Sequence, residues 1–151
     1  MKEPTFSIIL KYALYAAFVV GILMSATLPL MIDTYARYLG FGRLAESYRA
    51  FIVPFLMVVS IPSLWAVLEM IGMMRSIPTD PFVMRNVKAL NRIGLIFFML
   101  SAAFLVKCFL FISFLTIVCV FFFIGSGLFS FTLAALIRQS IVFREENDLT
   151  I

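Results

Sequence analysis

Two charged residues, Glu69 and Lys107, each interrupt a long run of apolar residues, and they are the first candidates for chemistry. An ionisable side chain inside a membrane-spanning segment is by default a candidate for moving ions or protons. Glu69 lies about one and a half helical turns from the end of its run, so it can also reach the headgroup region or pair with Arg92 or Arg138. We expect structural pairing or snorkelling to the headgroups, and an ion- or proton-coupled pathway is the alternative.

Other chemistries lack their usual residues. The sequence contains no histidine, and its two cysteines, Cys108 and Cys119, both lie in apolar runs. Zinc or haem sites and histidine-based catalysis are therefore disfavoured. The cysteine spacing is not that of a redox motif, so we expect two small apolar side chains. With no paired carboxylates or activated nucleophile in view, we predict a protein that is not an enzyme, with no catalytic residue, cofactor or metal.

The most structured polar signal begins at Pro78-Thr79-Asp80-Pro81. Asp80 is suited to cap a helix and Pro81 to its first position. The short helix that follows is predicted to be amphipathic, with Phe82, Val83, Val87 and Leu90 on one side and Arg85, Lys88 and Arg92 on the other. Its basic side is suited to anionic lipid at the membrane surface or to a partner protein.

The C-terminal tail, Arg144 to Ile151, supplies the opposite charge. Three acids and the terminal carboxylate near a helix C-terminus oppose the helix dipole, so the basic face, a cytosolic partner or simple solvation must compensate them. The candidate partner-binding residues are Arg85, Asn86, Lys88, Arg92, Glu145, Glu146, Asn147, Asp148, Leu149 and Thr150.

Composition indicates the elements that position these residues. Of the 151 residues, 64% are hydrophobic and 13% are charged, whereas globular domains carry about half and about a quarter. We predict an all-α integral membrane protein, a single four-helix bundle with spans at about 12–32, 51–74, 93–111 and 115–137. The apolar stretch from 93 to 137 is too long to cross a bilayer of about 30 Å once, so it must turn back near Leu110 to Phe114.

Small residues occur at spacings that let membrane helices approach closely. The pairs are Gly21 with Ser25, Ser126 with Ser130, and Ser130 with Ala134. A four-helix bundle needs such contacts internally, so they leave the oligomeric state open.

The basic residues predict the orientation. With both termini in the cytoplasm, that side would hold Lys2, Lys11, Arg75, Arg85, Lys88, Arg92, Arg138 and Arg144, and the outside would hold Arg37, Arg43, Arg49 and Lys107. This bias satisfies the positive-inside rule. We expect a multi-pass protein of the bacterial inner membrane with N- and C-termini in the cytoplasm.

Pro81-Phe82, Asn86, Lys88, Leu90 and Ile93-Gly94, together with the terminal Glu146-Asn147-Asp148-Leu149-Thr150-Ile151, carry a resemblance. The chain resembles, over nearly its whole length, a bacterial family of four-span membrane proteins of unknown function with a C-terminal E-N-D-L-T-I motif. Members are often encoded beside a small Cro-type helix-turn-helix regulator. The resemblance implies such a regulator as partner, and it implies no activity.

Three function classes remain. We rank first a regulator or sensor that binds a cytosolic partner through its cytoplasmic loop and tail, then a small transporter or channel subunit, then an immunity-type membrane protein. The expected partners are the lipid bilayer and the helix-turn-helix regulator, with no direct binding of nucleic acid.

Overall fold

The chain forms four long helices in the computed structural model, which describes residues 5–38, 43–76 and 80–148. They are α1 (Thr5–Tyr38), α2 (Arg43–Met74), α3 (Met84–Leu110) and α4 (Phe114–Asp148), and the described residues contain no strand. Each helix contains a segment long and apolar enough to cross a membrane. The all-α prediction with four apolar helices is therefore confirmed.

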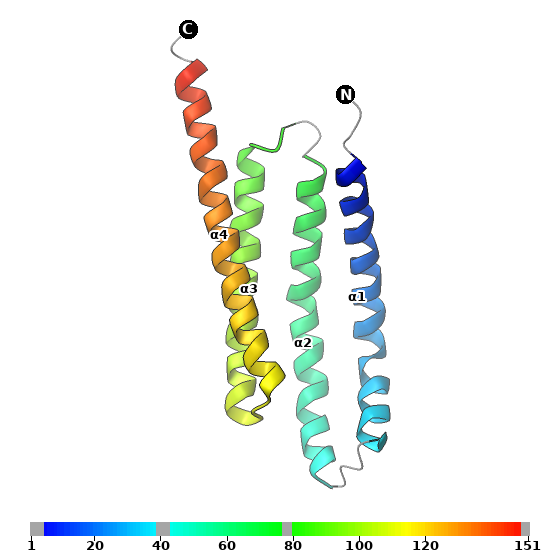
Figure 1. Ribbon diagram of the computed structural model, residues 1–151. Helices are drawn as coiled ribbons and strands as arrows, with labels where there is room; N and C mark the ends of the chain where they lie inside the picture. The colour runs from blue at the N-terminus through cyan, green and yellow to red at the C-terminus, as the bar shows by residue number, and fades with distance from the viewer. Residues whose placement is uncertain (1–4, 39–42, 77–79, 149–151) are drawn as a thin grey trace.

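The helices run alternately up and down in an open row (Figure 1). Among the described residues, close backbone approach is confined to neighbours in sequence, namely α1 with α2, α2 with α3 and, most extensively, α3 with α4. No such approach of α1 to α4 closes the row into a compact bundle. The start of α1, the end of α4, the end of α2 and the start of α3 share one end of the row, the terminal end. The end of α1, the start of α2 and the α3–α4 connection lie at the opposite, turn end (Figure 1).

The connection between α3 and α4 lies where the sequence predicts it, because α3 ends at Leu110 and α4 begins at Phe114. Phe111 has an extended backbone (φ −141°, ψ 92°) that stops the helix without glycine or proline. Its N–H still donates to the Lys107 carbonyl at 2.8 Å. The last turn of α3 therefore keeps that backbone hydrogen bond before the chain reverses.

The amphipathic segment before the third span is not a separate helix. It forms the first turns of α3, which begins at Met84 and continues unbroken into the apolar part. Val83, not Asp80, occupies the N-cap position, with an extended backbone and no side-chain cap. Asp80 instead accepts a hydrogen bond from the Phe82 N–H at 2.9 Å, so its carboxylate bonds within the connection. The N-cap of α3, Val83, lies three residues after the predicted cap.

Two apolar clusters join the helices. One packs α2 against α3 through Val59, Ala66, Ile96 and Leu100, and the other packs α3 against α4 through Val87, Leu90 and Ala134. Aromatic rings extend the first cluster across three helices, in contacts between Phe55 and Phe104, Phe104 and Phe123, and Phe97 and Phe123. In lipid, such packing rather than water exclusion holds helices together.

α3 and α4 approach each other closely at two glycines. A methyl group on Gly127 would lie 2.9 Å from the Phe98 ring and 3.3 Å from the Gly94 carbonyl oxygen. A methyl group on Gly94 would lie 3.1 Å from the Phe131 ring, and the Phe98 and Phe131 rings stack with centroids 5.9 Å apart. The absence of side chains at both glycines therefore permits this crossing.

Candidate functional site

Glu69 and Arg92 form an ion pair between α2 and α3. Arg92 Nε lies 2.8 Å from Glu69 Oε1, and Arg92 Nη2 donates to Oε2 at 2.8 Å, the two-point geometry that favours arginine with carboxylates. Trp65 Nε1 also donates to Oε1 at 3.3 Å. The expected pairing of Glu69 with Arg92 is confirmed, and Glu69, whose side chain is 16% exposed, has its charge balanced.

Arg85, in the first turn of α3, also approaches α2. Arg85 Nη2 lies 3.8 Å from the position a methyl group would take on Gly72 of α2. Three residues after Gly72, Arg75 donates from Nη2 to the Tyr15 hydroxyl of α1 at 3.4 Å. Arg75, directly after α2, and Arg85 and Arg92 of α3 therefore lie beside α2 at the terminal end.

Asn86, a predicted partner-binding residue, is only 2% exposed. Its Nδ2 donates to the Pro81 carbonyl at 2.9 Å, and its Oδ1 accepts from the Ser76 hydroxyl at 2.7 Å. A buried amide satisfied in this way stabilises the connection between α2 and α3. Asn86 thus braces that connection from inside and is left out of the docking surface proposed below.

The α2–α3 connection is tied to the end of α4. Arg144 Nη1 lies 2.9 Å from Asp80 Oδ2, with side-chain exposures of 62% and 38%. The charges are opposite to the predicted arrangement, since the base comes from the tail and the acid from the connection. An exposed pair of this kind contributes about 0–1 kcal/mol, so it links the two segments without locking them.

The acidic residues Glu145 and Glu146, followed by the amide Asn147, continue α4 as an exposed helical end. The side chain of Asp148, and Leu149 and Thr150, lie outside the described residues. Arg85 and Arg92 reach α2, whereas Val87 and Leu90 of the same helix face α4. The geometry therefore does not support a single surface shared by the basic α3 stripe and the acidic tail.

Lys107 lies near the turn end and faces α4. It is 9% exposed, and its Nζ donates to the Thr116 hydroxyl, itself buried, at 3.0 Å. Six residues earlier in α3, the Ser101 hydroxyl donates to the Val120 carbonyl at 3.2 Å. These two bonds join α3 to α4 across their interface, which supports a structural role for Lys107.

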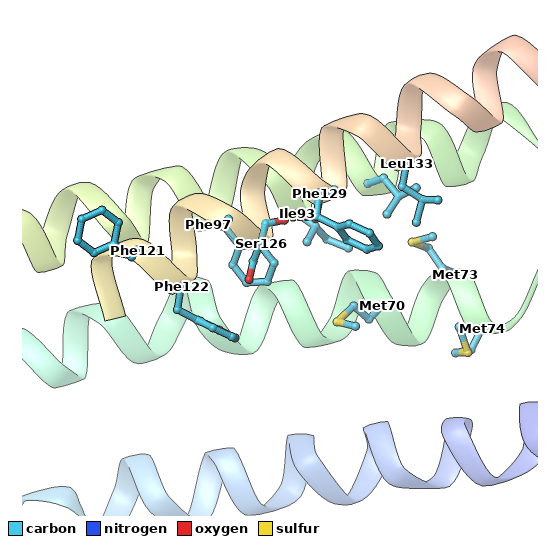
Figure 2. A pocket seen from close by; sticks show the side chains of 13 residues that line it. Met70, Met73, Met74, Ile93, Phe97, Phe121, Phe122, Ser126, Phe129 and Leu133 are labelled. Carbon is cyan, nitrogen blue, oxygen red and sulfur yellow. Dashed lines mark hydrogen bonds between the residues drawn. The ribbon is translucent and has the colours of Figure 1, made fainter. Parts of the chain in front are cut away.

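An apolar groove of about 630 Å³ opens between α2 and α4 with α3 at its base (Figure 2). Met70, Met73 and Met74 line one wall. The polar side chains in the lining are Ser126 and Ser130, and the Ser130 hydroxyl donates to the Ser126 carbonyl at 2.9 Å within α4. The groove therefore offers shape and apolar surface but little polar recognition.

Sequence reasoning missed several of these contacts. Nothing in the spacing of Asp80 and Arg144, or of Lys107 and Thr116, indicates that they meet. Gly127 carried a usable signal, because a glycine in an apolar span invites close helix packing. Within the described residues, no group of three or more His, Cys, Asp or Glu side chains is arranged to hold a metal ion.

Comparisons of the chain with protein-family models, curated proteins and solved structures found no match.

Proposed function

We propose that the chain is a non-enzymatic multi-pass protein of the bacterial inner membrane that acts as a regulator or sensor, binding a cytosolic partner at its terminal end. Both termini would lie in the cytoplasm, in agreement with the positive-inside bias of the sequence. The four apolar helices support the membrane location.

The observation that carries the docking role is the length of α4. Its apolar part ends near Ile137, and the helix continues to Asp148, about 16 Å farther at 1.5 Å per residue. The last residues of this helix, from Arg144 to Asn147, are polar or charged and exposed, and Arg144 contacts Asp80 in the α2–α3 connection. This helix end therefore presents a preformed helical surface on the same side as that connection.

The weakness of the Arg144–Asp80 pair suits a reversible contact. A partner that binds Arg144 or the neighbouring acids Glu145 and Glu146 would compete with a pair contributing about 0–1 kcal/mol. Displacement would uncouple α4 from the α2–α3 connection. A sensor requires a partner that binds the state with the broken pair more tightly than the state with the intact pair. The family resemblance makes a small helix-turn-helix regulator the candidate partner.

A transporter function is less well supported because both intramembrane charges have partners. Glu69 pairs with Arg92, and Lys107 donates to Thr116. Moving an ion past either residue would first require breaking these contacts. The groove of Figure 2 is lined by apolar side chains and gives an ion little to coordinate.

Site-specific photocrosslinking tests the docking proposal. A photoreactive residue at Glu145, exposed at the end of α4, should form a discrete adduct with a cytosolic protein in intact cells. Charge reversal by Arg144→Glu should reduce the adduct, because it reverses a charge that the partner would bind. Arg138→Glu is the matched control, since Arg138 is on the same helix but outside the pair. The absence of any discrete adduct from Glu145, or equal loss in both variants, would refute the docking role.

A further inference from the structure

Five basic residues lie at the terminal end, and we call them the basic seam: Lys11 of α1, Arg75 in the turn after α2, and Arg85, Lys88 and Arg92 of α3. Arg75 contacts Tyr15, and Lys11 is on the same face of α1 as Tyr15, one turn away. Arg85 reaches over Gly72, which is three residues before Arg75. Helical spacing aligns Arg85, Lys88 and Arg92 on one face of α3, and contacts between the helices bring that face close to Arg75.

The basic seam carries excess positive charge. Glu69 is the acid that pairs with it, and its partner is Arg92. Asp80 pairs instead with Arg144. Among the described residues, Lys11, Arg85 and Lys88 show neither a hydrogen bond nor an ion pair with another residue. Clustered cations repel one another, so an anion bound between them would stabilise this arrangement.

Exposed apolar side chains continue from the basic seam along α2 and α3, away from the terminal end. On α2, Leu68, Trp65 and Ile61 are exposed along the stripe that leads away from Gly72. On α3, Leu95 and Met99 follow Arg92 by three and seven residues and are also exposed. Residues at these spacings share a helix face. The surface therefore has a cationic end and an apolar continuation on two adjacent helices.

We propose that the basic seam binds the phosphate headgroup of an anionic phospholipid whose acyl chains lie along the exposed apolar side chains of α2 and α3. Basic pockets between membrane helices on the cytoplasmic side suit such headgroups. The apolar continuation selects a lipid over a soluble anion, which would use only the cationic end. The site is separate from the α4 surface proposed for docking and goes beyond that function.

Trp65 is the sequence's only tryptophan and lies one turn from Glu69, so it reports directly on this site. The full chain is reconstituted in phosphatidylcholine vesicles containing brominated phosphatidylglycerol or brominated phosphatidylcholine, because bromine on an acyl chain quenches tryptophan fluorescence on contact. Preferential quenching by the anionic lipid is the expected result. Equal quenching by the two lipids would overturn the proposal.

Variants localise the preference. Arg75→Gln with Arg85→Gln should weaken the selectivity for phosphatidylglycerol about 30-fold. Lys11→Gln with Lys88→Gln should weaken the selectivity similarly. These two side chains make no hydrogen bond, so this variant tests the site even if the Arg75 and Arg85 substitutions perturb folding. Arg138→Gln with Arg144→Gln removes the same charge from α4 and should leave the selectivity unchanged. Loss of selectivity in this control, or its retention in both seam variants, would contradict the site.

Inorganic phosphate separates the lipid from a soluble ligand. Added at constant ionic strength, it should leave the quenching by brominated phosphatidylglycerol unchanged, because it cannot occupy the apolar part of the site. Displacement of the lipid by phosphate alone would assign the basic seam to a soluble anion and reject the lipid proposal. The crosslinking from Glu145 is independent of either result.

Discussion

Substitution of Gly127 by alanine should destabilise the contact between α3 and α4. The added methyl group would lie 2.9 Å from two atoms of the Phe98 ring, whereas ordinary van der Waals contact begins at 3.4 Å. The ring would have to move by 3.4 − 2.9, or about 0.5 Å. It is stacked on Phe131, and the Gly94 carbonyl oxygen lies on the same side at 3.3 Å. The helices must therefore separate or the ring pair must repack.

The expected loss in the free energy of unfolding is about 1–3 kcal/mol, the usual effect of overpacking a well-packed contact. Alanine also favours a helix over glycine by up to about 1 kcal/mol, which would mask part of the loss. Gly125→Ala controls for this term, because a methyl group on Gly125 would meet nothing within 4 Å. The difference between the two variants isolates the steric cost.

Equilibrium unfolding in mixed micelles of a mild detergent and dodecyl sulfate, followed by circular dichroism, measures this difference. Gly127→Ala should unfold at a lower dodecyl sulfate fraction than Gly125→Ala. A difference of 1–3 kcal/mol corresponds to roughly a 5- to 150-fold change in the folded-to-unfolded ratio. Equal midpoints for the two variants, or a higher one for Gly127→Ala, would refute the close crossing as described.

Three further predictions concern the polar contacts and the orientation. Thr116→Val should lower the unfolding midpoint, because it removes the acceptor of the buried Lys107 ammonium. Adding Lys107→Met should restore part of the loss. Additive losses in the double variant would exclude a coupling between Lys107 and Thr116. Glu69→Gln should preserve expression and membrane insertion. If the parent shows a pH-dependent ion flux in proteoliposomes, the variant should show the same flux, and its loss in the variant would favour the transporter alternative. In a background with both native cysteines replaced, a cysteine at Ser47 should be labelled from outside intact cells and one at Gln139 only after permeabilisation, and equal labelling of both would contradict the four-span topology.

Several features followed from the sequence because they depend on local pattern and length. Long apolar runs can satisfy their backbone groups in lipid only as helices, so the helix number was predictable. The reversal near Leu110 followed from the length of one run against the bilayer thickness. The pairing of Glu69 with a basic residue followed because its charge lies near one end of its helix, where basic residues gather.

Local pattern was less reliable where a side chain had two uses. Asp80 has the residue type of a helix cap, yet its carboxylate accepts the Phe82 N–H and contacts Arg144. Asn86 has the polarity of a surface residue, yet it is buried against the α2–α3 connection. Such choices depend on which partner lies close in space, and sequence spacing does not contain that distance.

What the sequence by itself determined is the set of helices and the stripes of residues on each, since helical periodicity alone aligns Arg85, Lys88 and Arg92 on one face. Tertiary structure decided where each stripe points. Burial of Val87 and Leu90 against Ala134 sets the rotation of α3, which turns Arg92 toward Glu69 of α2 and away from the acidic tail. A helix can rotate about its axis without changing its own hydrogen bonds, so only contacts with neighbouring helices specify that rotation.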